Sequence, residues 1–248
     1  KRAVVVGGGF IGLEVAENLT VQGVNTSVID MAGQILPGFE PEIANYVDNY
    51  LADQRIITFT ETGLEAILGD GKVEKIKTNN RTMKADAVVL SIGIRPNTAF
   101  LNGSGIELAP NRAIKVNEKL ETNIKDIYAV GDCAFVTNII TGKGAYAPMG
   151  STANIEGRIL AQNINGNNLN YKGAIGTAVV KLPGINAGKT GLTEDAAKSE
   201  GYNVETVTTV MEDKAKYYPG ASVFIIKMIA DKVSKKLLGV QVVGEGNI

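Results

Sequence analysis

A glycine-rich turn between an apolar β-branched run and a helical pattern constrains this chain more than any other feature. The run at residues 3–6 is followed by Gly7-Gly8-Gly9-Phe10-Ile11-Gly12, and apolar residues then recur at helical spacing. A second strand-like run, residues 24–29, follows and ends at Asp30. Strand, glycine turn, helix and strand in this order predict a βαβ unit at the start of the chain.

The glycine spacing in this turn is that of a dinucleotide-binding motif. Gly7 allows a tight turn, Gly9 lets the backbone approach a pyrophosphate, and Gly12 lets helix and strand pack closely. The amides that open the helix supply partial positive charge for the phosphates. The alternative is a glycine turn without a ligand, but the strand before it and the acidic residue after it favour a dinucleotide site.

Asp30 predicts which dinucleotide is preferred. It lies at the end of the second strand, where a carboxylate accepts hydrogen bonds from the adenosine ribose hydroxyls. A 2′-phosphate there would be repelled by on the order of 4 kcal/mol per charge pair at about 4 Å and an effective dielectric of about 20. Met31 and Ala32 offer no arginine to offset this repulsion. We therefore expect NADH over NADPH, the alternative being that Asp30 only caps a turn.

Composition excludes several other mechanisms. The 248 residues include no histidine and one cysteine, Cys133, and the formal net charge is −1. The chain cannot build a Ser-His-Asp triad, a Cys-His pair or an imidazole metal ligand, and we expect no metal site. The near-neutral charge and the lack of any apolar run of about 20 residues make nucleic acid and membrane unexpected partners. The N-terminal residues lack a signal-peptide layout, so we expect a cytoplasmic protein.

Periodicity and turn signals predict the remaining elements. Turn dipeptides within residues 64–83 favour antiparallel hairpins, and residues 87–92, apolar except for Ser91, have the pattern of a buried strand in a parallel sheet. A short buried strand is expected over residues 127–130. Helices are expected over residues 41–52, 152–163 and 194–199, and further strands over residues 56–60, 178–182, 204–211, 223–230 and 237–243.

A second phosphate motif is rejected. Residues 184–190 end in the Gly-Lys-Thr of a P-loop, but Pro183 stands where that loop needs a glycine. Proline also removes one of the amide donors that would surround a phosphate. We expect an ordinary turn between a strand and a polar segment here.

Three segments together resemble the FAD-dependent pyridine nucleotide-disulfide oxidoreductase family. They are GGGFIGLE at residues 7–14, AVVLSIGIRPNT at residues 87–98 and TNIKDIYAVGDCA at residues 122–134. The third is the most specific, because such a stretch is a flavin-ribityl signature in that family. The likeness continues through residues 148–160 and the run Tyr217-Tyr218-Pro219-Gly220. The branch it resembles contains NADH oxidases, NADH peroxidases and coenzyme A-disulfide or persulfide reductases.

The resemblance implies roles at the nucleotide end. Phe10 stands where relatives often have a tyrosine that gates the nicotinamide pocket, and Glu14 matches a glutamate beside the nicotinamide. On the residues alone, core packing explains Phe10 equally well and a solvated helix position explains Glu14 equally well. The backbone positions that it assigns to NAD(H) are Gly7, Gly8, Gly9, Phe10, Ile11, Gly12 and Gly93.

The resemblance also implies a flavin end. Asp132, after Gly131, would bond the ribityl chain of FAD; a turn-forming role is the alternative, but the full motif around Asp132 favours the flavin contact. The helix that opens at Ser151, Thr152 and Ala153 would direct its dipole toward the flavin pyrimidine, where negative charge develops on reduction. Cys133 matches a structural position, and we expect it to pack as a small apolar side chain.

Tyr217 and Tyr218 are expected to lie at a homodimer interface. In the disulfide-reductase branch, such residues reach toward the redox cysteine of the partner subunit. Simple interface packing by two aromatic side chains is an equally good interpretation.

The fold class is α/β. We expect an NAD(H)-binding Rossmann-type domain at residues 1–101, the C-terminal half of an FAD-binding domain at residues 102–168, and an α+β dimerisation domain at residues 169–248. Relatives carry a flavin-binding glycine motif and a redox cysteine ahead of the nucleotide strand. We therefore expect a fragment of a longer flavoenzyme, inactive by itself and holding little FAD.

The expected activity of the intact protein is hydride transfer from NADH through FAD to a cysteine-based disulfide, persulfide or sulfenate centre. The final acceptor stays open among a small-molecule disulfide, a persulfide, a peroxide and oxygen. Two alternatives also stay open, a non-catalytic NADH-binding regulatory protein and a ferredoxin-reductase-like flavoenzyme.

Overall fold

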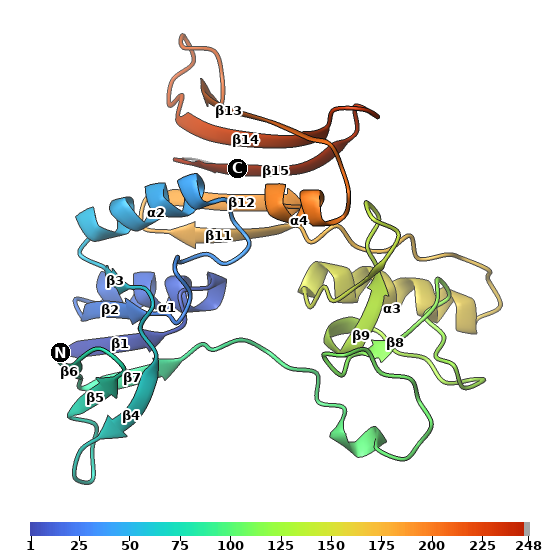
Figure 1. Ribbon diagram of the computed structural model, residues 1–248, viewed down its shortest axis with the longest axis horizontal. Helices are drawn as coiled ribbons and strands as arrows, with labels where there is room; N and C mark the ends of the chain where they lie inside the picture. The colour runs from blue at the N-terminus through green and yellow to red at the C-terminus, as the bar shows by residue number, and fades with distance from the viewer. Residues whose placement is uncertain (246–248) are drawn as a thin grey trace. The chain divides into compact units, whose positions relative to one another are not determined.

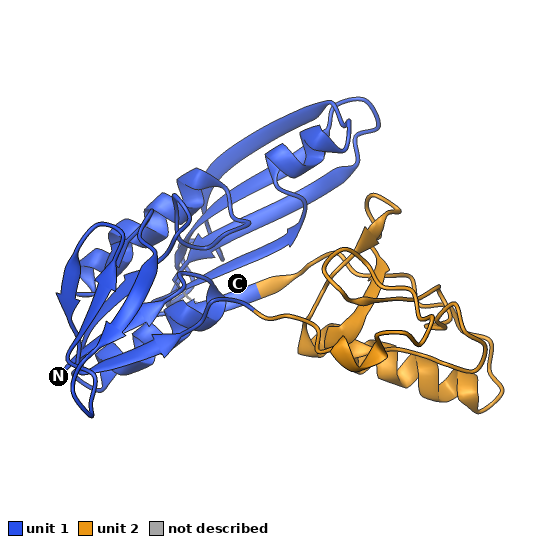
Figure 2. Ribbon diagram, turned by 60° about the horizontal axis from the view of Figure 1, so that its bottom comes forward, with its two compact units in different colours: residues 1–93, 179–248 blue, residues 94–178 orange. Residues whose placement is uncertain are grey.

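The computed structural model describes residues 1–245, and the chain forms two compact units (Figures 1 and 2). The first unit joins residues 1–93 to residues 179–248, and the second is residues 94–178. The division into functional domains at residues 101 and 168 stays a prediction.

A parallel sheet opens the first unit. Its strand order is β3-β2-β1-β7, with β1 at Arg2–Val6, β2 at Asn25–Ile29, β3 at Ile57–Phe59 and β7 at Ala87–Leu90. All three neighbouring pairs run parallel. Helix α1 (Phe10–Val21) connects β1 to β2, and α2 (Pro41–Asp53) connects β2 to β3. The expected βαβ unit is thus confirmed.

Strand β7 differs from its prediction in burial. It ends at Leu90 and pairs only with β1, so it forms an edge of the sheet. Leu90 is 55% exposed and Ile92 76% exposed. The expectation of a wholly buried strand over residues 87–92 was wrong, because an apolar run reports β propensity but not how many neighbours the strand has.

A small antiparallel sheet covers one face of the parallel sheet. Its strands β4 (Leu64–Leu68), β5 (Lys75–Thr78) and β6 (Thr82–Lys84) pair as the turn dipeptides predicted. Ile76 and Ala85 from this part pack with Val4, Val6 and Ile29 of β1 and β2 in one apolar cluster.

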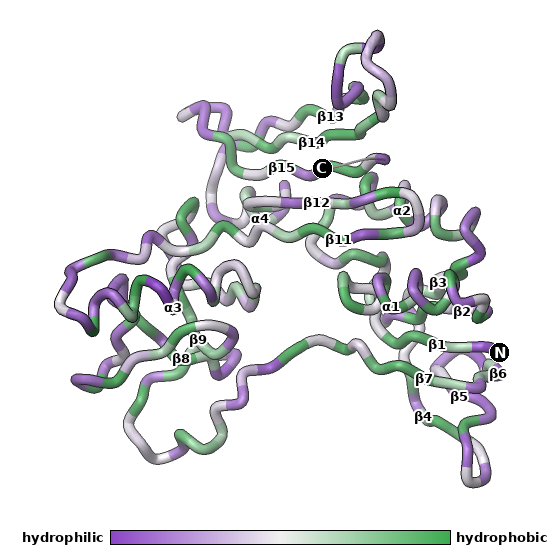
Figure 3. Tube along the Cα trace, turned by 180° about the vertical axis from the view of Figure 1, so that it is seen from behind, coloured by the Kyte–Doolittle hydropathy of each residue, from purple (hydrophilic) through white to green (hydrophobic). Residues whose placement is uncertain are grey.

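The C-terminal part of the first unit is a five-stranded sheet ordered β11-β12-β15-β14-β13. Figure 3 shows β14 as mostly hydrophobic. Thr193 caps the short helix α4 (Glu194–Ser199) by accepting a hydrogen bond from the amide of Ala196. The strands are β11 (Ala178–Leu182), β12 (Ile185–Gly191), β13 (Val204–Glu212), β14 (Val223–Asp231) and β15 (Leu237–Gly244).

Strand β12 corrects one prediction. Residues 184–190 were expected to form a turn, but the turn is confined to Pro183 and Gly184, and residues 185–191 form a strand. Six of its residues pair antiparallel with β15. This long-range pairing overrides the weak strand propensity of asparagine and glycine in the segment. A strand in an antiparallel sheet cannot wrap a phosphate, so rejection of the P-loop stands.

One apolar core joins the two sheets of the first unit. Leu13 and Ala16 of α1 and Ile43 and Val47 of α2 pack with side chains from the five-stranded sheet. The contributors from that sheet are Val180, Leu182, Ile185, Ala187 and Val243, all at most 1% exposed. Both helices are therefore covered on the face that turns away from the parallel sheet.

The second unit contains the helix α3 (Gly150–Ile164) and three short strands. Strand β9 (Ala134–Thr137) pairs parallel with β8 (Ile114–Lys115) and antiparallel with β10 (Gly144–Ala145). Two short 3-10 helices are η1 (Ala99–Leu101) and η2 (Gly131–Cys133). Its core gathers Leu120, Ala134, Val136, Tyr171 and Ala174.

The strand expected over residues 127–130 does not form. Thr122 donates its amide to Ile127, Ala129 donates to Leu120, and a single bridge joins Glu121 to Tyr128. Leu120 and Asp126 both have positive φ, which closes this segment into a turn rather than an extended ladder.

Within residues 1–245, none of the helices combines the length and apolar character that crossing a membrane requires.

The shared core of the first unit predicts the effect of one substitution. Leu182 is completely buried between the five-stranded sheet and the two helices. We expect Leu182→Ala to lower the free energy of unfolding by about 2–5 kcal/mol, because it leaves a cavity. Val179→Ala, on the same strand but at a side chain 59% exposed, should change it by at most about 0.5 kcal/mol. Urea unfolding of both variants measures this, and equal effects would contradict the shared core.

Candidate functional site

A cavity of about 530 Å³ lies at the carboxyl ends of the parallel strands. Four of the residues predicted from the sequence line it, namely Gly7, Gly9, Asp30 and Gly93. The remaining lining residues are Val6, Ile29, Met31, Pro37, Thr62, Leu64, Leu90, Ser91 and Ile92. In open α/β sheets, ligands bind at this end of the strands.

Each glycine of the turn occupies its position for a different physical reason. Gly7 has a φ of 111°, and a Cβ there would lie 2.2 Å from the carbonyl oxygen of Ser91. A Cβ on Gly12 would lie 1.8 Å from the carbonyl oxygen of Gly7. A Cβ on Gly9 would meet nothing within 4 Å, so the space beside Gly9 is open to a ligand.

The first turn of α1 presents amides toward an anion. Gly9 is its N-cap and provides no side-chain cap, and the first helical hydrogen bond runs from the amide of Leu13 to the carbonyl of Gly9. The amides of Phe10, Ile11 and Gly12 precede that bond, so the helix does not use them. Together with the helix dipole they suit a phosphate group.

Asp30 already holds the glycine turn. One carboxylate oxygen accepts a hydrogen bond from the amide of Gly8 at 2.6 Å, and the other accepts from the amide of Ala32 at 2.8 Å. A carboxylate has about four acceptor positions, so capacity for sugar hydroxyls remains. Asp30 lines the cavity while doing this. The sequence predicted a ligand contact here but not the additional role in fixing the turn.

Phe10 and Glu14 lie apart from the cavity lining. The Phe10 ring packs against Phe39, with ring centroids 5.8 Å apart, at the edge of the shared core. Glu14 is exposed on α1. Both placements agree with the simple packing and solvation alternatives, and the roles implied by the resemblance stay predictions.

Sequence reasoning missed Pro37, Thr62 and Leu64. Thr62 follows the end of β3 and is 2% exposed, and its amide donates to the carbonyl of Asp30. The signal that could have found it is its place after a parallel strand, because carboxyl ends of neighbouring strands meet at one edge. Pro37 gives no such signal.

The predicted flavin residues lie in the second unit. Ser151 and Thr152, in the first turn of α3, line a cavity of about 450 Å³ together with Ile155 and Ile159. The N-cap of α3, Met149, makes no side-chain cap, so the first amides of the helix are open to an acceptor. Ala153 is inside the helix and donates its amide to Met149.

A buried carboxylate joins α3 to the Gly131–Asp132 turn. Glu156 is 1% exposed and accepts a hydrogen bond from the amide of Gly131 at 2.6 Å. The Tyr171 hydroxyl also bonds Glu156, and burial together with this carboxylate raises the pKa of Tyr171 to about 12. Burial raises the pKa of Glu156. The Asp132 side chain is exposed, so the turn offers it outward.

Cys133 has the environment of a structural thiol. Its Sγ donates to the carbonyl of Val130 at 3.4 Å. Burial, with the carboxylates of Glu156 and Asp132, raises its thiol pKa. A raised pKa disfavours the thiolate that a nucleophile needs, which supports the packing interpretation.

Tyr217 and Tyr218 lie in the connection between β13 and β14. They are 83% and 56% exposed, and their ring centroids are 5.0 Å apart. Two exposed aromatic rings beside an edge strand are available to a partner.

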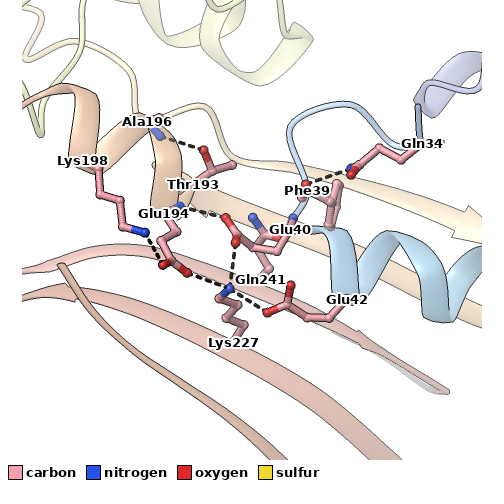
Figure 4. A network of polar contacts seen from close by, with 10 residues as sticks. All are labelled: Gln34, Phe39, Glu40, Glu42, Thr193, Glu194, Ala196, Lys198, Lys227 and Gln241. Carbon is pink, nitrogen blue, oxygen red and sulfur yellow. Dashed lines mark hydrogen bonds and ion pairs between the residues drawn. The ribbon is translucent and has the colours of Figure 1, made fainter. Parts of the chain in front are cut away.

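A buried ammonium group ties the residues next to the cavity to the five-stranded sheet (Figure 4). Lys227 on β14 is 4% exposed, and its Nζ lies 2.7 Å from Glu40, 2.6 Å from Glu42 and 3.1 Å from Glu194. Glu40 is the N-cap of α2, and its amide donates to the side chain of Gln241 at 2.7 Å. No group of metal-ligating side chains occurs among residues 1–245.

Comparison with known proteins agrees with this geometry. The family model of pyridine nucleotide-disulphide oxidoreductases matches residues 1–157, and the model of the dimerisation domain of the same family matches residues 177–247. The chain belongs to the pyridine nucleotide-disulphide oxidoreductase family. The resemblance inferred from the three sequence segments is thereby confirmed, as is the α/β fold class.

Individual members of the family align with almost the whole length of this chain. An NAD(P)H coenzyme A polysulfide/persulfide reductase of Pyrococcus horikoshii is 36% identical over 98% of this chain and 55% of its own length. The solved structure of an NAD-dependent persulfide reductase from A. fulgidus matches with a TM-score of 0.95 at 36% identity, over 100% of this chain and 46% of that chain.

A third similar protein is the water-forming NADH oxidase of Lactobacillus brevis, solved bound to NADH. Its TM-score is 0.93 at 26% identity, over 100% of this chain and 55% of that chain. The chain thus spans about half the length of the relatives that it matches.

The ionisation of the Lys227 cluster predicts how stability depends on pH. Burial opposes ionisation of Glu42, but its hydrogen bonds and the Lys227 charge outweigh this and lower its pKa. Hydrogen bonds from Lys198 and then Lys227 lower the pKa of Glu194. Burial opposes the charge on Lys227, but hydrogen bonds to its three carboxylates raise its pKa.

The direction in which pH changes the free energy of unfolding follows from these pKa shifts. Lowered carboxyl pKa values stabilise the fold above their ordinary value of 4.5, and a raised lysine pKa stabilises it below 10.5. We expect the free energy of unfolding to fall below about pH 4.5 and above about pH 10.5. In Lys227→Met the carboxylates lose their partner, so the deficit relative to the native chain should shrink between pH 7 and pH 4. Urea titrations across pH measure this, and a deficit that stays constant would contradict it.

Proposed function

We propose that this chain is the NADH-binding and interface portion of a flavoprotein oxidoreductase. In the intact protein, a hydride would pass from NADH through FAD to a cysteine-based disulfide, persulfide or sulfenate centre. The observation that carries the proposal is the cavity at the carboxyl ends of the parallel strands, which combines the open face of Gly9, the first amides of α1 and the Asp30 carboxylate. The oxidase from Lactobacillus brevis, solved bound to NADH, supports it by analogy.

The dinucleotide would lie across the glycine turn. Its pyrophosphate would accept from the amides that open α1, and the adenosine ribose would donate to Asp30. Gly7, Gly8 and Gly93 would lie along it, with Phe10 and Glu14 toward the nicotinamide. A 2′-phosphate would be repelled by the Asp30 carboxylate, so we propose NADH as the preferred cofactor.

Part of a flavin site is proposed in the second unit. FAD, when bound, supplies the acceptor for the hydride and then passes electron pairs onward. The donor set fits this group, because α3 opens without a side-chain cap and Asp132 is turned outward. Asp132 and Gly131 would hold the ribityl chain, and the dipole of α3 at Ser151, Thr152 and Ala153 would favour negative charge on the flavin pyrimidine.

The electron acceptor is proposed only as a class. Relatives include a coenzyme A polysulfide/persulfide reductase and a water-forming NADH oxidase. We propose a small-molecule disulfide, persulfide, peroxide or oxygen. The single cysteine has no disulfide partner within this chain, which fits a reducing compartment, and we propose the cytoplasm as its location.

A homodimer is proposed through strand β13. This strand is one of the two edges of the five-stranded sheet, and the matched family model is that of a dimerisation domain. Val207, Val210 and Met211 on β13 are 49%, 65% and 50% exposed. An open edge with exposed apolar side chains is a surface that proteins normally cover. Tyr217 and Tyr218, exposed in the connection that follows β13, would also contact the partner subunit.

Replacing Asp30 tests the nucleotide site. We expect Asp30→Ala to weaken NADH binding on the order of 10- to 100-fold, because a charged hydrogen-bond partner is worth about 1.5–3 kcal/mol. Asp70→Ala, at an exposed hairpin turn outside the cavity, is the matched control and should leave the affinity unchanged. Isothermal titration calorimetry measures both. Absence of any NADH binding by the folded native chain would refute the proposed function, and equal affinities for the two variants would refute the role of Asp30.

Replacing Val210 tests the interface. We expect the native chain to sediment as a dimer and Val210→Glu to sediment as a monomer, because the substitution places a charge in an apolar contact. Val233→Glu introduces the same charge at a side chain 77% exposed in the turn between β14 and β15 and should remain dimeric. Sedimentation velocity decides between these outcomes. A native chain that is monomeric at all concentrations would count against this interface.

A further inference from the structure

One wall of the nucleotide cavity is formed by the loop between β3 and β4, residues 60–63, and by Leu64 at the start of β4. Thr62 of this loop and Leu64 both line the cavity. The amide of Thr62 donates to the carbonyl of Asp30 at 2.7 Å. The loop is therefore bonded to the strand end that carries the carboxylate proposed to hold the adenosine ribose.

Glu61 gives this loop a backbone conformation that needs support. Its φ of 51° lies in the left-handed region, which costs energy for a residue with a side chain. Such a conformation persists only where surrounding contacts fix it. On the side of the loop that faces Asp30, the amide of Glu61 donates to the carbonyl of Ala32 at 2.9 Å. The remaining support comes from the opposite side of the loop.

Two asparagines in the turn between β5 and β6 hold that opposite side. The side-chain amides of Asn79 and Asn80 each donate to the carbonyl of Glu61 at 3.1 Å. Asn79 also bonds both backbone groups of Gly63, because its Oδ1 accepts from the Gly63 amide at 2.9 Å and its own amide donates to the Gly63 carbonyl at 3.2 Å. Asn80 adds a bond of 3.4 Å to the hydroxyl of Thr62. Each residue from 61 to 63 is thus bonded to this turn.

The turn that carries the two asparagines is itself anchored. The Thr78 side chain, in a residue 3% exposed, accepts from the amides of Asn80 at 3.3 Å and Arg81 at 3.0 Å. The Arg81 guanidinium lies over the Phe59 ring, 4.6 Å from its centroid, in a cation–π contact. Phe59 ends β3, and its carbonyl accepts from the amide of Asp30 at 2.9 Å. The turn therefore has a fixed position relative to the parallel sheet.

We propose that Asn79 is a positioning residue for the adenosine half of bound NADH. Asn79 does not line the nucleotide cavity. It acts through Glu61 and Gly63, which place Thr62 against the Asp30 carbonyl. This inference rests on the proposed NADH site and adds to it a residue of the small antiparallel sheet.

The physical reason is preorganisation of the cavity wall. In the native chain the loop is ordered before a ligand arrives, so binding does not have to order it. Without the Asn79 side chain, the Gly63 amide loses its acceptor and the Glu61 carbonyl keeps one of its two side-chain donors. Glu61 can then leave the left-handed region, and Thr62 moves with it. Only a fraction of the chains then has the binding-competent loop, and the apparent dissociation constant rises by the inverse of that fraction.

Calorimetric titration of the 248-residue chain with NADH and with AMP tests the inference. Both ligands carry adenosine, so both occupy the affected end of the cavity. We expect Asn79→Ala to weaken the binding of both by about three- to tenfold. Asn80→Ala removes one donor to Glu61 and leaves the Gly63 bonds in place, so its effect should be smaller. Asn25→Ala, at an exposed asparagine that begins β2 and lies outside the cavity lining, is the matched control and should leave both affinities unchanged.

A compensating substitution separates positioning from a general loss of stability. Asparagine adopts the left-handed region more readily than glutamate, so Glu61→Asn needs less support from the turn. We expect Glu61→Asn to restore most of the affinity that Asn79→Ala loses. The gain is compared with the effect of Glu61→Asn in the native chain, so the influence of the lost Glu61 charge cancels.

The outcomes are distinct. Unchanged affinity in a folded Asn79→Ala chain overturns the inference, and so does a loss that Glu61→Asn does not restore or a loss confined to NADH. Asn79→Ser keeps a turn-forming residue while removing the amide donor, and it takes the place of Asn79→Ala should that variant not fold. A native chain without affinity for NADH overturns the proposed function together with the inference, whereas native binding that Asn79→Ala matches overturns the inference alone.

Discussion

The close approach of two backbone segments at the glycine turn governs the rest of this structure. A Cβ on Gly12 would lie 1.8 Å from the carbonyl oxygen of Gly7, so only glycine lets α1 start where β1 ends. This approach directs the first amides of α1 to the carboxyl edge of the parallel sheet. It also fixes the face of α1 that packs, through Leu13 and Ala16, on the five-stranded sheet. One steric condition thus sets both the proposed anion-binding end and the core.

Much of the fold was predictable because local patterns agreed with tertiary structure. Helices α2 and α4 and the strands β13, β14 and β15 lie where periodicity placed them, within two residues at each end. The failures occurred where partners far along the chain decide the outcome. Residues 185–191 form a strand because β15 pairs with them, and β7 is half exposed because it has one neighbour. Neither fact can be deduced from a local window of sequence.

The candidate site was predictable to a different extent at each residue. Gly7, Gly9, Asp30 and Gly93 line one cavity because each follows a parallel strand or belongs to a recognisable turn. Pro37 and the Glu40–Lys227 pair belong to the same region, but 187 positions separate the two charged residues. A lysine in an apolar strand and a glutamate before a proline carry no mutual signal in one sequence. Their pairing follows only from the packing of the sheet on α2.

Asp30 and Glu40, which hold two segments next to the cavity, differ in how their contacts depend on charge. Asp30 fixes the glycine turn by accepting hydrogen bonds from two backbone amides. Its carboxylate keeps further acceptor positions that sugar hydroxyls can use. Glu40 instead depends on a buried ammonium, an arrangement whose desolvation cost is repaid only while every partner is present. The first support belongs to the nucleotide sheet alone. The second ties Glu40, the N-cap of α2, to the five-stranded sheet, whose outer strand β13 is the proposed dimer interface. The proposed cofactor site and the proposed assembly surface are therefore joined through β14, which carries Lys227 and pairs with β13 along nine residues.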